Sequence, residues 1–455
     1  MVSENRTAAI KLPLPVHQLA LYLAATLIVY LPLEPAVLSA LPQAWYWPMR
    51  LAPDAAIGVL AAFAVLDGTL ERRAKVALVG MAVIVVLIAG LNLSRGISLI
   101  DSINALRVLL RYIGLGIALW GYRRALDPAP VIVTAVLVSG IVQVLAGAVG
   151  IGSDVLSSED SPFEAALLEA GTTGRYDRFG ILMACVLLAA FAASMPRVRG
   201  WIPLLGCFAM TMLVFSNSRQ AVAAAAAGLA ALSCLPALPR LTRGLAVVAA
   251  VVVVATGLAI PAIPTQPTVG GDMDGQSPIE PSNGSSAKPP TSEELPRSRG
   301  SSRFSTDPNE NFRLFLVLDM APWAIREEPL LGFGPAQHSA LDTDDRLEQY
   351  VEAAGTTWAW ARRFTNDSNY ASMLIQFGLP LTVGFVGLLI ALTVSVSRRA
   401  WRRRDPYAAL GVSVALAIAV AAFLGPAFET RVTSIILWTV LFTAAGGPKA
   451  VKEIQ

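Results

Sequence analysis

Two arginines inside an apolar segment are the residues of this chain whose chemistry stands out most. Arg107 and Arg111 lie four residues apart within the stretch 101–122, so a helix would place both on one face. A charge near the centre of a bilayer costs on the order of 2.5 to 3.5 kcal/mol, so such residues face a bundle interior or a wet cavity. With no compensating carboxylate nearby in the sequence, the pair is predicted to bind a mono- or diphosphate. A structural role, as an ion pair with a carboxylate from elsewhere in the chain, is the alternative.

Three further arginines lie outside the interiors of the apolar segments. Arg219 follows Ser218 at the start of one such segment, where free N–H groups and the helix dipole favour an anion. Arg313 lies in the first turns of a predicted amphipathic helix. The alternatives are an interfacial anchor for Arg219 and a solvated helix face for Arg313. Arg178 follows an acidic segment and is either a substrate ligand or a local salt-bridge partner.

The composition identifies the class of protein that must position these arginines. Hydrophobic residues make up 55% of the chain, charged residues 15%, and the mean hydropathy is +0.59. A water-soluble globule of 455 residues does not have this composition, so the chain is predicted to be an integral membrane protein. The chain has only two histidines, so neither zinc chemistry nor a metal or other cofactor is expected.

Apolar stretches long enough to span a bilayer recur along the chain. Spanning the hydrocarbon core takes about 20 mostly apolar residues, and an all-α membrane fold of about twelve such helices is predicted. The predicted stretches are 16–33, 50–67, 74–93, 101–122, 129–151, 178–195, 201–217, 219–235, 243–262, 369–395, 406–425 and 430–446. The seventh and eighth are separated by only a residue or two, so one broken helix is an alternative for that pair.

Basic residues fall in alternate short loops, which predicts the orientation of the chain. They are Arg72, Arg73, Lys75, Arg123, Arg124, Arg197, Arg199, Arg240, Arg243, Arg398, Arg399, Arg402, Arg403 and Arg404. By the positive-inside rule these loops and both termini are predicted to be cytoplasmic. The usage of Ala, Val, Leu and Arg suggests a bacterium, so the cytoplasmic (inner) membrane is the expected location. The rule also accounts for the net charge of +3, so a nucleic-acid partner is not expected.

A long polar segment between the ninth and tenth stretches is then predicted to lie outside the cytoplasm. Residues 1–262 carry the first nine helices, and 263–306 form a linker whose Pro, Ser and Gly content is typical of disorder. Residues 307–366 are predicted to be ordered. The remaining residues, 367–455, carry the last three helices and a cytoplasmic tail.

Local signals predict short amphipathic helices in the ordered part of this outer segment. Asp307 can cap a helix that Pro322 should kink and that ends at about Glu328, before Pro329. Glycines and Pro335 then make a turn, and a second short helix is predicted over 344–354. The first helix is expected to lie across the bundle at the membrane surface.

Several short motifs, taken together, resemble the O-antigen ligase and O-antigen polymerase superfamily. They are Ser218-Arg219, Asn311-Phe312-Arg313, Trp323-Ala324-Ile325, Pro329-Leu330-Leu331-Gly332-Phe333-Gly334-Pro335, Ser368-Asn369-Tyr370 and Phe377-Gly378-Leu379-Pro380. The resemblance implies a metal-independent membrane glycosyltransferase, similar to the GT-C class, that uses glycans carried on undecaprenyl pyrophosphate. It also implies that Arg219 and Arg313 engage the pyrophosphate and that Asn369 contributes to the substrate site.

One position departs from the ligases of that family. They typically place a histidine before the asparagine that opens the tenth span, and this chain has Ser368 before Asn369. Asp367 or His338 is the candidate general base instead. The departure favours a polymerase, which joins lipid-linked repeat units; a ligase acting on lipid A core and a lipid-linked oligosaccharide flippase are the alternatives. Undecaprenyl pyrophosphate-linked glycans and the bilayer are the expected partners, and a chain-length regulator protein is a further candidate.

Overall fold

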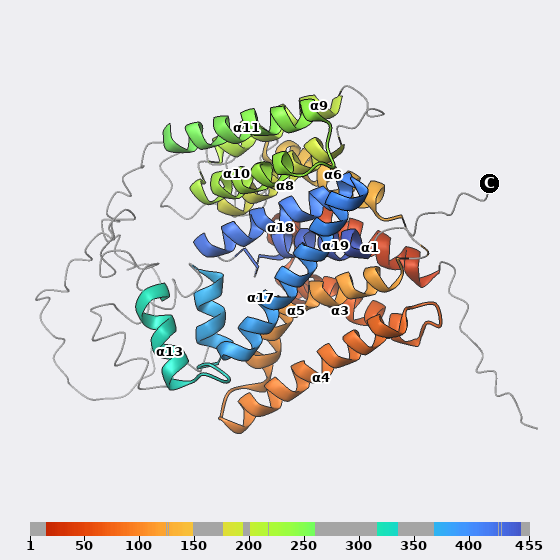
Figure 1. Cartoon of the computed structure of the whole chain (residues 1–455). Coiled ribbons are helices and arrows are strands. Elements are labelled where there is room, and N and C mark those ends of the chain that lie inside the picture. The colour runs from red at the N-terminus through yellow and green to blue at the C-terminus, as the bar shows by residue number, and fades with distance from the viewer. Residues whose placement is uncertain are drawn as a thin grey trace, which may run out of the picture.

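The computed structural model describes ten segments of the chain, all of them helices and the turns between them (Figure 1). The described residues are 15–123, 125, 127–148, 176–193, 201–216, 218–259, 316–334, 368–425, 427–428 and 430–446. The predicted all-α fold is confirmed over these residues, which contain no strand.

Each of the twelve apolar stretches is occupied by a helix. The helices are α1 (Val16–Tyr30), α3 (Gln43–Leu66), α4 (Arg72–Ser94), α5 (Leu99–Gly121), α6 (Ala129–Ala148), α8 (Tyr176–Ala193), α9 (Trp201–Phe215), α10 (Arg219–Cys234), α11 (Arg240–Ala259), α17 (Asn369–Arg403), α18 (Pro406–Leu424) and α19 (Arg431–Gly446). Within the described residues, six of them, α3 to α6, α17 and α18, are long and apolar enough to cross a membrane; α1, α8, α10 and α19 are shorter apolar helices. That all twelve span the bilayer stays a prediction.

The seventh and eighth stretches form two helices instead of one broken helix. α9 ends at Phe215 and α10 begins at Arg219. Ser218, in extended backbone conformation, caps α10 by accepting a hydrogen bond from the N–H of Ala221 at 3.2 Å. A capping serine accepts a hydrogen bond from one of the free N–H groups of a first turn, so Ser218 marks the start of a separate helix.

The core of the bundle lies around α18 and α19, whose side chains are buried on nearly all sides. Small residues let neighbouring backbones approach closely. A Cβ atom added at Gly228 of α10 would lie 2.6 Å from a methyl group of Leu188 in α8. By contrast, α4 and α11 lie at the periphery and expose many valines and leucines, as expected of helices that face lipid.

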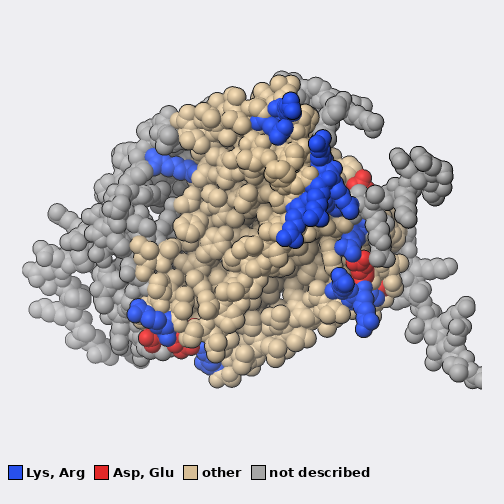
Figure 2. Space-filling model, viewed as in Figure 1, with Lys and Arg blue, Asp and Glu red and all other residues tan. Residues whose placement is uncertain are grey.

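Basic side chains are distributed unequally between the two ends of the bundle. Figure 2 shows Lys and Arg gathered mainly on the side where α4 begins and α17 ends in Figure 1. This side is called the basic end below. Two ion pairs hold it together, Arg123 with Glu71 at 2.8 Å and Arg399 with Asp405 at 2.7 Å. The basic end corresponds to the end predicted to be cytoplasmic.

The predicted amphipathic helix is described only in its second half. The π-helical turn η3 (Leu316–Met320) continues directly into α13 (Ala321–Glu327), and Glu328 is its C-cap. The predicted end at about Glu328 is therefore confirmed, and Pro322 falls where the helix changes from π to α form. The predicted start at Asp307, the linker 263–306 and the second short helix 344–354 lie outside the described residues.

The helix predicted over 369–395 is longer than expected and is broken near its start. α17 continues to Arg403, and Gly378 inside it has non-helical angles, φ 72° and ψ −176°. The break and Pro380, which has no N–H, leave backbone carbonyls of the preceding turn without their usual helical donors. The N–H of Phe333 donates to the carbonyl of Ile375 at 2.8 Å, and the N–H of Gly334 donates to that of Gln376 at 3.1 Å.

The contact between the turn 329–334 and the break in α17 requires glycine on both sides. The N–H of Leu379 donates to the carbonyl of Pro329 at 2.8 Å, which completes the backbone pairing. A Cβ atom at Gly332 would lie 2.7 Å from the carbonyl carbon of Gln376, and one at Gly378 would lie 2.7 Å from the carbonyl carbon of Leu330. These two glycines allow the backbones to touch.

Replacing Gly378 by alanine should therefore destabilise the protein by about 1–3 kcal/mol for the backbone strain alone. The matched control is Gly384→Ala in the same helix, where a Cβ atom meets nothing within 4 Å. That substitution should be neutral or stabilising, because glycine is a poor helix residue. Thermal unfolding of the two purified variants in detergent measures the difference. Equal unfolding midpoints of the two variants would contradict the requirement for glycine at the break in α17.

Candidate functional site

Five of the eight predicted site residues lie in the described part of the chain. They are Arg107, Arg111, Arg178, Arg219 and Asn369. The other three, Arg313, His338 and Asp367, lie outside the described residues, so their roles stay predictions. Arg178, Arg219 and Asn369 lie in the first turns of α8, α10 and α17, whereas Arg107 and Arg111 lie further along α5.

Arg107 and Arg111 are compensated by a carboxylate that the sequence analysis did not identify. Arg111 donates from Nη1 to Oδ1 of Asp54 at 2.7 Å, and Nη1 of Arg107 lies 3.3 Å from Oδ2 of the same carboxylate. Asp54 belongs to α3, 57 residues before Arg111, so proximity in the sequence could not show the pair. The two arginines share one negative charge, as the alternative interpretation has it, and their role as substrate ligands stays a prediction.

A second ion pair lies beside the first. Arg431, at the start of α19, pairs with the buried carboxylate of Glu34 in the short helix α2 (Glu34–Ala40). Burial raises the pKa of the Glu34 carboxyl above its ordinary value, and the positive charges of Arg431, Arg111 and Arg50 act in the opposite direction. Arg50 also donates to the hydroxyl of Tyr46 at 3.1 Å.

Four arginines and two carboxylates thus form one group of charges, called the arginine cluster below. Its members are Glu34, Arg50, Asp54, Arg107, Arg111 and Arg431. Among the described residues the cluster thus joins charged side chains of α2, α3, α5 and α19. The guanidinium of Arg111 also lies over the ring of Tyr112, 4.6 Å from its centroid.

Arg219 is the first residue of α10, and its side chain is exposed. The next residue, Gln220, fixes this end of α10 to α18 by donating from Nε2 to the carbonyl of Ala421 at 2.7 Å. Gly425, just beyond α18, gives this amide room: a Cβ atom there would lie 2.8 Å from Gln220 Nε2. This hydrogen bond attaches the start of α10 to α18.

Asn369 is fully buried, and its side chain has a structural contact. Its Oδ1 accepts a hydrogen bond from the N–H of Phe428 at 2.7 Å, which fixes the start of α17 to the turn before α19. The hydroxyl of Tyr370 donates to the carbonyl of Ala419 at 3.2 Å. The starts of α10 and α17 are therefore both attached to the last turns of α18, so Arg219 and Asn369 lie at the same end of the bundle.

Arg178 lies in the first turn of α8 and is partly buried. This turn abuts the region between α9 and α10, because a Cβ atom added at Gly180 would lie 2.6 Å from both Ser216 Oγ and Ala221 Cβ. The structure thus brings Arg178 to the neighbourhood of the start of α10. No sequence signal predicted this proximity, because α8 and α10 are separated by a whole helix.

Comparison with known proteins finds a family match over the middle and later part of the chain. Residues 201–386 match the family described as O-antigen ligase. The matched segment runs from α9 to the first half of α17 and contains Arg219, Arg313, His338, Asp367 and Asn369. The resemblance to the O-antigen ligase and polymerase superfamily is thereby confirmed. No curated protein shows a significant match to the chain.

Removing the carboxylate of Asp54 should show how much it contributes to the stability of the protein. Asp54→Asn leaves two arginines without a counter-charge, and breaking a buried pair from one side costs about 3–5 kcal/mol. The double variant Asp54→Asn/Arg111→Gln should recover part of this loss, because one of the two stranded charges is gone. Thermal unfolding of the purified variants in detergent is the measurement. A double variant less stable than Asp54→Asn would contradict the pairing.

Proposed function

Because this chain carries the O-antigen ligase match over residues 201–386, we propose that it is a polysaccharide polymerase of the bacterial cytoplasmic membrane. It transfers a growing glycan from undecaprenyl pyrophosphate to a lipid-linked repeat unit on the outer face of that membrane. The family match supports the broader class, a membrane glycosyltransferase-like enzyme of O-antigen ligase or polymerase type. The unequal distribution of basic residues supports the orientation, with the basic end in the cytoplasm.

The position of Arg219 is the observation that carries the proposal. Its side chain is exposed at the start of α10, inside the matched segment and at the end opposite the basic end. The first turn of a helix presents free N–H groups and the positive end of the helix dipole. A guanidinium beside that first turn suits the oxygens of a pyrophosphate.

The reaction that this arrangement can assist is a displacement at the anomeric carbon of the donor glycan. A hydroxyl oxygen of the acceptor sugar forms the new bond to that carbon, and the bond from the carbon to the pyrophosphate oxygen breaks. The electron pair leaves with the pyrophosphate, so negative charge develops where Arg219 and Arg313 would stabilise it. The hydroxyl proton passes to a base, for which Asp367 and His338 are the candidates. In-line attack inverts the anomeric configuration.

A polymerase is preferred over a ligase because of residue 368. The ligases of the superfamily typically have a histidine there, and this chain has Ser368, whose side chain is fully buried. A buried serine hydroxyl is a poor base for an acceptor hydroxyl. A ligase that transfers the glycan to lipid A core remains the second candidate, because the matched family carries the description O-antigen ligase.

Replacing Arg219 by alanine should abolish glycan polymerisation while the protein stays folded in the membrane. Removing one charge-stabilising donor lowers rates by about 100- to 1,000-fold in comparable sites. Arg72→Ala is the matched control, because Arg72 is also an exposed arginine at the start of a helix, α4, but lies at the basic end. Polymer length on a gel is the measurement. A normal ladder from Arg219→Ala would overturn the assigned role.

The choice of acceptor separates the two candidate functions. Purified protein in nanodiscs, supplied with lipid pyrophosphate-linked repeat units alone, should produce a ladder of oligomers. Transfer that begins only when lipid A core is added would instead identify a ligase. Lipid-linked sugar that crosses the bilayer without any new glycosidic bond would point to a flippase and reject both.

A further inference from the structure

One face of α17 carries a row of exposed apolar side chains. The row consists of Leu379, Val383, Ile390, Val394 and Trp401, each of them 41–59% exposed. Successive members are separated by four or seven residues, so a helix places all of them on the same side. Because α17 is long and apolar enough to cross a membrane, this row is the side of the helix that faces lipid.

The length of the row places Trp401 at the level of the lipid head groups. Trp401 follows Leu379 by 22 residues, which corresponds to about 33 Å at the helical rise of 1.5 Å per residue. The hydrocarbon core of a bilayer is about 30 Å thick, so the row is as long as the core. Tryptophan is also enriched at the interface between membrane and water.

Exposed arginines surround Trp401 at this end of α17. Arg398 and Arg402 lie four residues apart on one side of the helix, and Arg403 and Arg404 follow where the helix ends. Figure 2 shows a basic patch on the surface where α17 ends in Figure 1. These four arginines and Trp401 are called the α17 corner below.

The carboxylate that follows the α17 corner is already bound by a fifth arginine. Asp405 pairs with Arg399 at 2.7 Å and caps α18 by accepting a hydrogen bond from the N–H of Tyr407 at 3.0 Å. Within the described part of the chain, no carboxylate lies at ion-pair distance from the four exposed arginines. The α17 corner therefore presents positive charge that the protein itself does not pair.

Arg404 has a backbone conformation that ordinarily favours glycine. Its φ of 50° and ψ of 40° are left-handed, and among the described residues it alone combines a side chain with a positive φ. Helices often end with glycine in this conformation, because a Cβ atom makes it costly. The chain thus keeps a cation where glycine would be less strained, which indicates that the charge serves binding and not folding.

We propose that the α17 corner binds the head group of an anionic phospholipid, whose acyl chains lie along the apolar row of α17. Guanidinium N–H groups match phosphate oxygens in spacing and direction. Groups of about four to eight basic residues directly beside a membrane helix are typical of sites for anionic lipids. A soluble acidic partner would make no use of the apolar row. The site does not depend on the proposed polymerase function.

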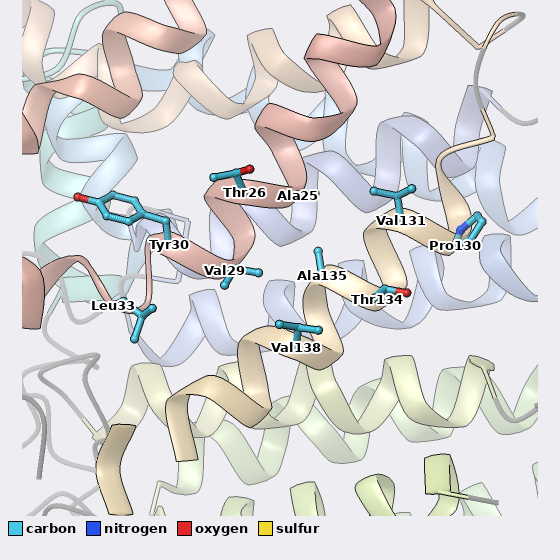
Figure 3. Close-up of a pocket in the computed structure, with 10 residues that line it drawn as sticks. All are labelled: Ala25, Thr26, Val29, Tyr30, Leu33, Pro130, Val131, Thr134, Ala135 and Val138. Carbon is cyan, nitrogen blue, oxygen red and sulfur yellow. The ribbon is translucent and has the colours of Figure 1, made fainter. Parts of the chain in front are cut away.

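A groove elsewhere on the bundle offers a contrast. It runs between α1 and α6, has a volume of about 710 Å³ and is lined by residues such as Val29, Val131 and Val138 (Figure 3). None of its described lining residues is charged. An acyl chain in this groove would bind whatever its head group is. Selectivity for an anionic head group therefore distinguishes the α17 corner from the groove.

Lipid titration of the full-length protein in detergent, measured by native mass spectrometry, tests the site. The wild-type protein should bind phosphatidylglycerol at least about tenfold more tightly than zwitterionic phosphatidylcholine, because each basic residue near an anionic lipid contributes about fivefold. The double variant Arg398→Gln/Arg402→Gln should bind phosphatidylglycerol about 25-fold more weakly, with phosphatidylcholine binding unchanged. Equal affinity of the wild-type protein for both lipids would overturn the proposal.

Two control variants show whether the loss is specific to this place. Arg72→Gln/Arg73→Gln also removes two exposed charges from the basic end, at the start of α4, where no tryptophan lies beside them. It should keep most of the affinity for phosphatidylglycerol. Val138→Trp, which fills the α1–α6 groove, should leave the selectivity unchanged. An equal loss in the α4 variant, or lost selectivity in Val138→Trp, would overturn the α17 corner as the site.

A charge-preserving variant and a soluble competitor exclude indirect effects. Arg398→Lys/Arg402→Lys keeps both charges and should bind phosphatidylglycerol within about fivefold of the wild-type protein. If it bound as weakly as the glutamine variant, the loss would not come from charge, and the proposal would fail. Inorganic phosphate should displace little lipid, because it has no acyl chains. Full displacement would identify a phosphate site instead of a lipid site.

Arg404→Gly separates lipid binding from folding. Glycine relieves the left-handed conformation, so the thermal unfolding midpoint without added lipid should rise. The affinity for phosphatidylglycerol should fall about fivefold, because one charge is lost. A lower midpoint, or unchanged lipid binding, would contradict the role assigned to Arg404.

Discussion

The pairing of backbone groups at the break in α17 is the constraint on which the position of α13 and the turn 329–334 depends. A helix interrupted by Gly378 and Pro380 exposes carbonyls that apolar surroundings cannot satisfy. The turn after α13 supplies the missing donors, and Arg95 holds that turn by donating to the carbonyl of Gly332 at 2.9 Å and pairing with Glu328 at 3.3 Å. The stacked rings of Trp323 and Phe333 complete the contact. The break in α17 therefore binds the turn that follows α13 and fixes its position.

Much of the fold could be predicted from the sequence, because runs of apolar residues identify membrane helices. All twelve apolar stretches are helices, and the end of α13 follows from Pro329. Contacts between distant residues could not be predicted in this way. Asp54 and Arg111 are 57 residues apart and Glu34 and Arg431 are 397 apart, so only the folded chain shows that each arginine has a counter-charge. The sequence shows the motifs around Gly332 and Gly378 as two separate segments. It does not show that the two segments contact each other.

The candidate site combines two kinds of arginine with different surroundings. Arg219 is exposed and lies at a helix start that hydrogen bonds to α18 hold in place. Arg111 is buried, with 7% of its surface exposed, and is held by Asp54. Both arginines could be identified from the sequence, because charged residues are rare within or beside apolar segments. The sequence could not show which side chain is exposed and which is buried. Asn369 shows the converse case, since a residue predicted to bind substrate has its side-chain oxygen bound to backbone.

The carboxylate of Asp54 has a consequence for how long a ligand can stay. A phosphate that binds Arg107 and Arg111 must share them with Asp54 or displace it, so the protein carries its own competitor for the anion. An internal competitor lowers the affinity of the two arginines for an added anion and raises the rate at which that anion dissociates. In the proposed glycosyltransferase, fast dissociation matters as much as capture, because product release often limits turnover.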